Sequence, residues 1–292
     1  MENDRSELRW GVEQRLEFIE FRLFWEGHVN RSDVMEKFGL SVNQASSDLS
    51  RYIRLAPANM TYDKSLRTYV RNTDFTSVFN KLNAGRYLAQ LRSLADDIMN
   101  TNDTWIAELP SYDAAPTPAR GVDPVILRSV VGAIRRSEAI EVRYQSLSRP
   151  EPCWRWIAPH AIGFDGFRWH TRAFCKIDEV FKDFLLSRII STRNVEASEI
   201  TEEADADWQE HVTLEIGPHP ELSESQRKVI ALDYGMREGK AEIQVRRALL
   251  YYALKRLGLD DNAPARPPQE QQIVLVSPIK GMAQGSSIER EG

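Results

Sequence analysis

Four prolines within a stretch of fifteen residues divide this chain into two parts with different hydrophobic patterns. Small and polar residues separate Pro110, Pro116, Pro118 and Pro124, a composition typical of an exposed linker. Before the stretch, apolar residues recur at helical spacing, and after it they follow the alternation of strands. We therefore expect a multidomain α+β protein with domains at residues 1–75, 76–119, 120–195 and 205–292.

The first part begins with three expected helices. The apolar stripe of the first helix consists of Leu8, Val12, Leu16, Ile19 and Leu23. The second helix should begin after Asn30, with Asp33 completing the cap, and end at Gly39, which suits the left-handed conformation past a helix end. Ser41 and Gln44 predict a capping box for the third helix. Its expected inward residues are Val42, Ala45, Leu49 and Ile53.

A predicted hairpin follows the third helix, from strand candidates at 60–62 and 66–70 joined through residues 63–65. This order predicts a winged helix-turn-helix in residues 1–75, with the third helix as recognition helix. Short polar side chains on its outer face can approach base edges, and basic ones can hold phosphates. The predicted DNA-binding residues are Asn43, Gln44, Ser46, Ser47, Ser50, Arg51 and Arg54, with Lys64 and Arg67 on the wing. The alternative is an ordinary solvated helix face.

Residues 76–109 have a helical pattern and are expected to form a connector to the next domain. The apolar stripe of this helix consists of Val78, Leu82, Tyr87, Leu88, Leu91 and Leu94.

The central domain is expected to contain a helix at 125–136 followed by antiparallel strands. The strand candidates are residues 139–145, 154–164, 167–175 and 181–188. Asp165 and Gly166 give the strongest hairpin signal in the chain, because glycine tolerates the positive φ of a primed turn. We expect a small five-stranded or partly closed barrel.

The C-terminal part should form a compact α+β unit. It contains a strand near 211–216, a helix from Ser223 to Tyr234, a strand at 240–245 and a helix at 246–257. Beyond Asp260 the composition is typical of partial disorder, although residues 273–276 could add an edge strand.

Strand alternation places Arg168, His170 and Arg172 on one face of the second predicted hairpin strand. The guanidinium group of arginine can bind phosphate through two hydrogen bonds, and the rings of Tyr and His can stack on a base. These residue types therefore favour a nucleotide or a short single strand as ligand. The predicted ligand-binding residues are Tyr144, Ser146, His160, Arg168, His170, Arg172 and Arg188. The alternative is a set of salt bridges to Asp165, Asp178 and Asp183 around a structural histidine.

Other classes of protein find little support in the sequence. The chain lacks a phosphate-binding P-loop motif, a Gly-x-Ser-x-Gly nucleophile elbow and a His-Glu-x-x-His zinc motif, and its five histidines lack metal-ligand spacing. Cys153 and Cys175 do not form a Cys-x-x-Cys pair. No apolar run approaches the roughly 20 residues that a membrane span needs, which favours a cytoplasmic protein. We predict no cofactor and no metal.

Local charge supports binding to nucleic acid although the net charge is −5. Residues 31–71 hold seven Lys and Arg against four Asp and Glu, and residues 120–193 hold thirteen against eight. Residues 196–292 hold eleven against eighteen, so an acidic C-terminal part masks two basic modules.

The central segments 140–146, 158–160, 166–173 and 186–188 resemble the WYL domain of bacterial transcription regulators. Trp169 matches the triplet that gives the domain its name, whereas His170 and Thr171 stand in place of Tyr and Leu. The order of winged helix, WYL domain and C-terminal extension is similar to regulators of the CapW and BrxR type, found beside phage-defence operons. The resemblance implies an Sm-like β-barrel that senses a nucleic-acid-like ligand, and a dimer built partly through the C-terminal domain.

The combined hypothesis is a homodimeric repressor that holds a palindromic operator and releases it when the WYL domain binds a nucleic-acid or nucleotide effector. This mechanism expects Arg172 and Arg188 beside an open cavity rather than in internal carboxylate pairs. The alternatives are an activator of the same family, a nucleotide-processing enzyme, and an interaction module whose winged helix contacts protein.

Overall fold

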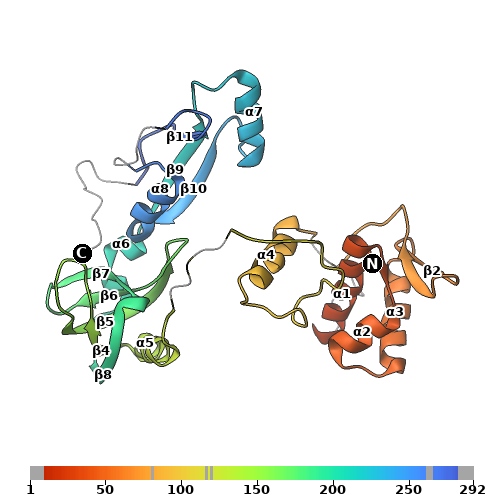
Figure 1. Ribbon diagram of the computed structural model, residues 1–292, viewed down its shortest axis with the longest axis horizontal. Coiled ribbons are helices and arrows are strands. Elements are labelled where there is room, and N and C mark those ends of the chain that lie inside the picture. Colours follow the sequence, from red (N-terminus) through yellow and green to blue (C-terminus); the bar gives the residue numbers. More distant parts are fainter. Residues whose placement is uncertain (1–9, 80–81, 116–117, 119–120, 261–265, 282–292) are drawn as a thin grey trace. The chain divides into compact units, whose positions relative to one another are not determined.

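The computed structural model describes residues 10–79, 82–115, 118, 121–260 and 266–281. The chain divides into two compact units, residues 1–118 and 119–292, each considered by itself. In Figure 1, helices α1 to α4 belong to the first unit, and α5 and all following elements belong to the second.

The first unit is a winged helix-turn-helix followed by a further helix. Its elements are α1 (Trp10–Glu26), β1 (His28–Val29), α2 (Arg31–Phe38), α3 (Val42–Leu55), β2 (Met60–Asp63), β3 (Thr68–Arg71) and α4 (Ala84–Ala95). The wing strands β2 and β3 are antiparallel, and β3 also pairs with β1. The core contains Leu16, Ile19 and Leu23 of α1, as the apolar stripe predicted, while Leu8 lies outside the described residues.

The helix caps match the sequence patterns in part. Asn30 and Asp33 form a reciprocal capping box, and Gly39 ends α2 in the left-handed conformation. The Ser41 side chain accepts a hydrogen bond from the Gln44 backbone, but the capping box predicted for α3 was wrong: the Gln44 side chain donates to Asp48 instead. Val42 was expected inside and is 47% exposed, because it occupies the first position of α3, beyond the packed stripe of Ala45 and Leu49.

The helix expected over residues 76–109 was wrong apart from α4. The buried carboxylate of Glu20 on α1 accepts hydrogen bonds from Val78 N, 2.8 Å away, and Phe79 N, 3.0 Å away, and so ties residues 78 and 79 to the first helix. Helix α4 begins only after Asn83, whose side chain caps it, and ends near Asp97, which has a positive φ of 54°. Residues 98–115 are irregular.

The second unit contains two β-sheets with helices around them. Its elements are α5 (Pro124–Arg136), β4 (Glu138–Tyr144), β5 (Cys153–Phe164), β6 (Trp169–Cys175), β7 (Val180–Leu185), η1 (Leu186–Arg188), β8 (Ile189–Ala197), η2 (Glu202–Ala204), α6 (Ala206–Gln209), β9 (His211–Pro218), α7 (Glu224–Asp233), β10 (Ala241–Arg246), η3 (Arg247–Leu249), α8 (Leu250–Leu257) and β11 (Ile273–Leu275). The strand orders are β7-β6-β5-β4-β8 and β10-β9-β11.

The five-stranded sheet is strongly curled. Its two edge strands, β7 and β8, are joined by only the three residues of η1, which span at most about 14 Å. A flat sheet would separate the same strands by about 19 Å. Backbone N–H groups of Leu185 and Gln145 donate to Tyr144 Oη and Arg188 O, at 3.3 and 3.1 Å, and hold this seam together. In the part of the chain that the structure describes, no ladder joins β7 to β8, so the closed Sm-like barrel stays a prediction.

The smaller sheet follows the expected order of strand, helix, strand and helix. Ser223 caps α7 with a reciprocal bond to Gln226, and β11 pairs with β9 at the edge of the sheet, as expected for residues 273–276. The central β9 places Val212 and Leu214 in one core with α8 and Ile216 in a second core with α7. Strand β8 had not been assigned a residue range from the sequence.

Candidate functional site

The outer face of α3 is the candidate DNA surface of the first unit. Asn43, Gln44, Ser47, Ser50 and Arg54 are exposed there. The other two predicted residues, Ser46 and Arg51, are half-buried. The guanidinium groups of Arg51 and Arg54 make no ion pair with any described residue, so both remain available to phosphate.

Two neighbouring residues join this face without having been predicted. Arg31, exposed at the start of α2, donates a 3.2 Å hydrogen bond to Ser46 Oγ and so lies beside the recognition helix. Val42 is an apolar exposed residue at its N-terminal end, where a thymine methyl group could be contacted. The basic residue next to the Asn30 cap was the available sequence signal for Arg31.

The wing presents Lys64 and Arg67 from an exposed turn. Asp63 Oδ1 accepts hydrogen bonds from Ser65 N at 2.7 Å and Leu66 N at 3.0 Å, which fixes this turn. Arg67 has a φ of 56° and belongs to the turn rather than to the strand expected at 66–70.

The second candidate site is on the outer face of β6, where His170 and Arg172 lie together as the alternation predicted. The hairpin before it is longer than expected: Phe164 pairs with Trp169, so the turn contains residues 165–168. Asp165 closes that turn and binds its neighbours, with Oδ2 2.7 Å from Arg168 Nε and 3.0 Å from His170 Nε2. Gly166 supplies the positive φ of 92°.

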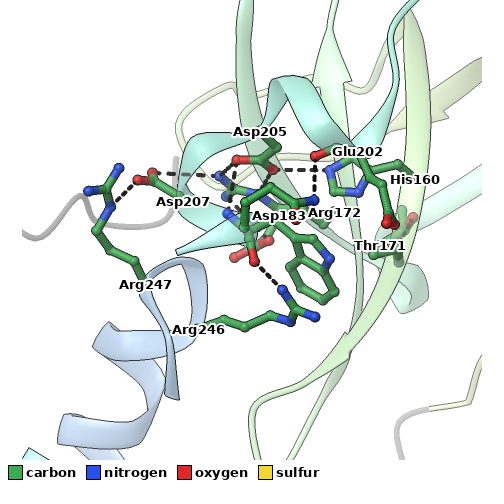
Figure 2. A network of polar contacts seen from close by, with 12 residues as sticks. His160, Thr171, Arg172, Asp183, Glu202, Asp205, Asp207, Arg246 and Arg247 are labelled. Carbon is green, nitrogen blue, oxygen red and sulfur yellow. Dashed lines mark hydrogen bonds and ion pairs between the residues drawn. The ribbon is translucent and has the colours of Figure 1, made fainter. Parts of the chain in front are cut away.

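Arg172 is held in a buried network of carboxylates (Figure 2). Its Nε and Nη2 donate to the two oxygens of Asp205 at 2.7 and 3.1 Å, a bidentate pair between side chains that are 8% and 2% exposed. Asp183 and Asp207 lie farther from the same guanidinium, at 3.5 and 3.7 Å. His160 Nε2 is 3.0 Å from Asp205 Oδ2. The structure thus places Arg172 in internal carboxylate pairs, the alternative that the sequence had left open.

A β-bulge brings His160 onto this face. The ladder between β5 and β6 pairs Pro159 with Ala173 and then Ala161 with Arg172, so His160 is the extra residue of β5. Its ring lies 5.7 Å from that of Trp208 on α6, and its Nδ1 is buried without a hydrogen-bond partner among the described residues.

Residues of the C-terminal sheet region cover the rest of the face. Tyr252 on α8 lies 5.0 Å from the His170 ring, centroid to centroid, and its hydroxyl donates to Asp183 at 3.0 Å. Burial raises the pKa of Asp183, although the nearby Arg172 acts in the opposite direction. Burial would also raise the pKa of Asp205, but His160 and Arg172 outweigh it and lower that pKa below its ordinary value.

The remaining predicted ligand residues form a separate group at the η1 seam. Tyr144 and Ser146 are buried, and Ser146 Oγ is 3.0 Å from Ser148 Oγ. Arg188 is half-buried, and its guanidinium makes no ion pair within the described residues. Of the two arginines on which the sensing hypothesis depends, only Arg188 is therefore free of carboxylates.

Sequence reasoning missed Asp205, Asp207 and Tyr252. Asp205 follows Arg172 by 33 residues, so no local spacing connects them. The available signal was the acidic run at 202–210, which was counted only as negative charge. Asp178, which had been considered as a partner of the candidate residues, pairs with Arg155 and Lys182 instead.

Acid should weaken the second unit through Asp165. Burial raises the pKa of this carboxyl, but hydrogen bonds from His170 and Arg168 more than compensate and lower the pKa from 3.8 to about 2. Because the folded pKa lies below the unfolded one, the stabilisation is complete above pH 4 and lost as the pH falls towards 2. Urea unfolding between pH 2 and 6 should show a shallower pH dependence for Asp165→Asn than for the parent chain. Equal slopes would contradict this assignment.

None of the helices in the described residues is long and apolar enough to cross a membrane. The same residues contain no group of three or more His, Cys, Asp and Glu side chains arranged to hold a metal ion.

Family comparisons divide the chain in the same order as the fold. Residues 11–93 match the BrxR transcriptional regulator winged helix-turn-helix domain, residues 125–194 match the WYL domain, and residues 211–280 match the BrxR transcriptional regulator C-terminal dimerization domain.

Similar proteins cover nearly the whole chain. The chain is 39% identical over 271 residues to the DNA-binding transcriptional repressor CapW of Stenotrophomonas maltophilia, an alignment that spans 92% of this chain and 91% of that protein. Proteins of the same description from Escherichia coli (strain KTE188) and Pseudomonas aeruginosa are each 38% identical over 93% of this chain. Among solved structures, the proteasome accessory factor PafBC of Arthrobacter aurescens aligns at 15% identity with a TM-score of 0.23, over 91% of this chain and 46% of that chain. This structural similarity is too weak to indicate a shared fold or function.

Proposed function

Since this chain belongs to the family of winged-helix WYL regulators that includes BrxR and the CapW repressors, we propose that it is a homodimeric, DNA-binding transcriptional repressor. The domains and relatives are those of a regulator and not of an enzyme. We further propose that it controls a phage-defence operon and leaves its operator when the WYL domain binds a nucleic-acid or nucleotide effector.

The observation that carries the DNA-binding half is the exposed face of α3. A capped recognition helix presents two unpaired arginines and a row of short polar side chains, with basic residues on the adjacent wing. Phosphate contacts from Arg51, Arg54, Lys64 and Arg67 would position the helix, and Asn43, Gln44, Ser47 and Ser50 would reach base edges. The Ser46 hydroxyl is already engaged, because it donates to Val42 O at 2.8 Å.

Footprinting upstream of the gene, followed by gel shifts over a salt series, tests this half. Arg54→Ala should weaken binding to all sequences alike and reduce the slope of log K against log salt by about 0.9, the value for one lost phosphate contact. Arg128→Ala changes an exposed arginine on α5 in the other unit and serves as the matched control. Equal salt slopes for Arg54→Ala and the parent chain would remove Arg54 from the interface, and the absence of any footprint would favour an interaction module.

The sensing half of the proposal rests on the two groups of residues around the curled sheet. Arg188, with Tyr144 and Ser146 beside the η1 seam, offers an arginine without a carboxylate partner in the described residues. His160, Arg168, His170 and Arg172 offer further donors, but each of them already contacts Asp165 or Asp205. Among these residues, Arg188 is therefore the donor that an anionic effector could bind without displacing a carboxylate.

Arg188→Ala should leave operator binding intact and prevent release, because the variant loses the available anion donor and keeps α3 unchanged. A reporter behind the operator, followed in phage-challenged cells, measures release, and an anisotropy titration with operator DNA measures binding. Arg128→Ala should behave as the parent chain in both assays. Loss of operator binding in a well-folded Arg188→Ala protein would show that sensing and DNA binding are not separate.

Two winged helices on one dimer would read half-sites about one duplex turn apart. Because the operator would bind α3 and the effector would bind the WYL domain, release would come from a change in dimer geometry rather than from competition of two polyanions for one surface. We propose that residues 211–280 hold the dimer together, in line with the dimerization domain that they match.

A further inference from the structure

The segment between the two sheets of the second unit, residues 201–210, is anchored by a single buried residue. Asp205 is 1% exposed, whereas neither η2 nor α6 contains a buried residue. On the side of the WYL sheet, the segment is therefore held mainly by the charge of the Asp205 carboxylate and by aromatic contacts of Trp208, with little apolar burial behind it. An anchor of this kind can be exchanged for another anion without disrupting a hydrophobic core.

The donors around Asp205 are those that a phosphate group would use. Arg172 presents a bidentate fork, and His160 presents Nε2 at 3.0 Å from the same carboxylate. Forked guanidinium donors bind carboxylate and phosphate with the same geometry. Nδ1 of His160 is buried without a hydrogen-bond partner among the described residues.

We propose that Asp205 is an internal occupant of an anion site formed by Arg172 and His160, and that a phosphate-bearing effector binds there by displacing it. This inference rests on the sensing role proposed above, and it adds that the Asp205 carboxylate competes with the effector for the same donors. Without effector, the carboxylate closes the site and Asp205 sets the effector concentration that the protein needs for a response. With effector, residues 201–210 leave the WYL sheet.

Displacement would be transmitted directly to the C-terminal sheet. Arg247 on η3 forms ion pairs with Asp207 and Glu210, Arg246 donates to Trp208 O, and β9 begins at His211. A shift of the segment therefore moves the contacts of β9, β10 and η3, which lie in the part that matches the dimerization domain. In this proposal, residues 201–210 couple effector binding to dimer geometry.

Calorimetric titration of the full chain with inorganic phosphate, in chloride buffer, tests the proposal. Asp205→Asn keeps the size of the side chain and removes the competing charge, so it should bind phosphate about tenfold more tightly than the parent chain. Adding Arg172→Gln to Asp205→Asn should abolish the gain. Asp178→Asn, which changes a carboxylate on the same domain that pairs with Arg155 and Lys182, should leave phosphate binding unchanged. An Asp205→Asn protein that binds no more tightly than the parent overturns the proposal.

Hydrogen exchange on the parent chain provides a test that does not depend on a folded variant. Trp208 N and Gln209 N donate to Asp205 within the short helix α6. Once Asp205 is displaced from Arg172 and His160, this helix loses its support on the sheet, so saturating phosphate should speed amide exchange in residues 206–210. Unchanged exchange at saturation counts against displacement.

Operator anisotropy in the same samples separates the two proposals. Tighter phosphate binding by Asp205→Asn without operator release supports the internal occupant and refutes effector-driven release. Operator release in phage-challenged cells, without tighter phosphate binding by Asp205→Asn, supports effector-driven release and refutes the internal occupant.

Discussion

Replacing Glu20 with alanine is expected to lower the free energy of unfolding of the winged-helix unit by about 3–5 kcal/mol. The Glu20 side chain is fully buried and accepts hydrogen bonds from the Tyr52 hydroxyl at 3.2 Å and from backbone N–H groups of Val78 and Phe79. Alanine would leave these donors buried without acceptors, at about 1–3 kcal/mol each. Urea unfolding of the full chain, followed by tryptophan fluorescence, gives the measurement.

The expected functional result of Glu20→Ala is the loss of operator binding at temperatures where the parent chain is fully folded. Glu20 connects α1 to α3 through Tyr52 and to the segment after the wing through Ser77, so its removal loosens the elements that orient the recognition helix. Glu36→Ala is the matched control, because Glu36 is an exposed carboxylate on α2, and its removal should change stability by less than about 0.5 kcal/mol. Similar losses for both variants would show that Glu20 has no special role.

Arg172→Ala is expected to destabilise the second unit by about 3–5 kcal/mol, because it leaves Asp205 and Asp183 buried beside each other without their cation. This stability effect must be separated from any effect on sensing. The double variant Arg172→Ala with Asp205→Ala should recover part of the loss, since both members of the pair are removed together. Thermal unfolding of the single and double variants measures the recovery. A strictly additive loss would show that the two side chains do not interact.

Asp183→Asn should stabilise the second unit at neutral pH, whereas loss of Arg172 should destabilise it. The pKa of Asp183 is raised by burial, so its ionised form is disfavoured in the folded protein, and stability falls as the pH rises from the unfolded pKa to the folded one. Asparagine keeps an acceptor for the Tyr252 hydroxyl and removes the charge. The variant should therefore be as stable as the parent chain near pH 4 and more stable at neutral pH. A marked loss at neutral pH would mean that Arg172 needs this carboxylate.

Local patterns predicted those parts of the fold that local chemistry determines. The Asn30 and Asp33 cap, the left-handed Gly39, and the Ser223 start of α7 were all readable from short spacings. Where the helix expected at 76–109 would begin, the structure instead has a tertiary contact, in which Glu20, more than fifty residues earlier, accepts hydrogen bonds from the N–H groups of Val78 and Phe79. No periodicity within 76–109 contains that information.

The candidate site shows the same division. Alternation along β6 correctly grouped His170 and Arg172, because the side-chain period of a strand is a local property. What covers that face is not local: Asp205 and Tyr252 come from other elements. The bulge at His160 also lies outside a simple alternating pattern, since one extra residue shifts every later side chain of the strand.

That extra residue has a consequence for how such proteins could diverge. Deleting His160 would give β5 and β6 an uninterrupted ladder and would leave all five strands in place. The shortened chain would retain its architecture while losing the imidazole that faces Asp205. Under the sensing role proposed above, a one-codon deletion would therefore remove the response while keeping the strand order, a route that a comparison of substitutions alone would overlook.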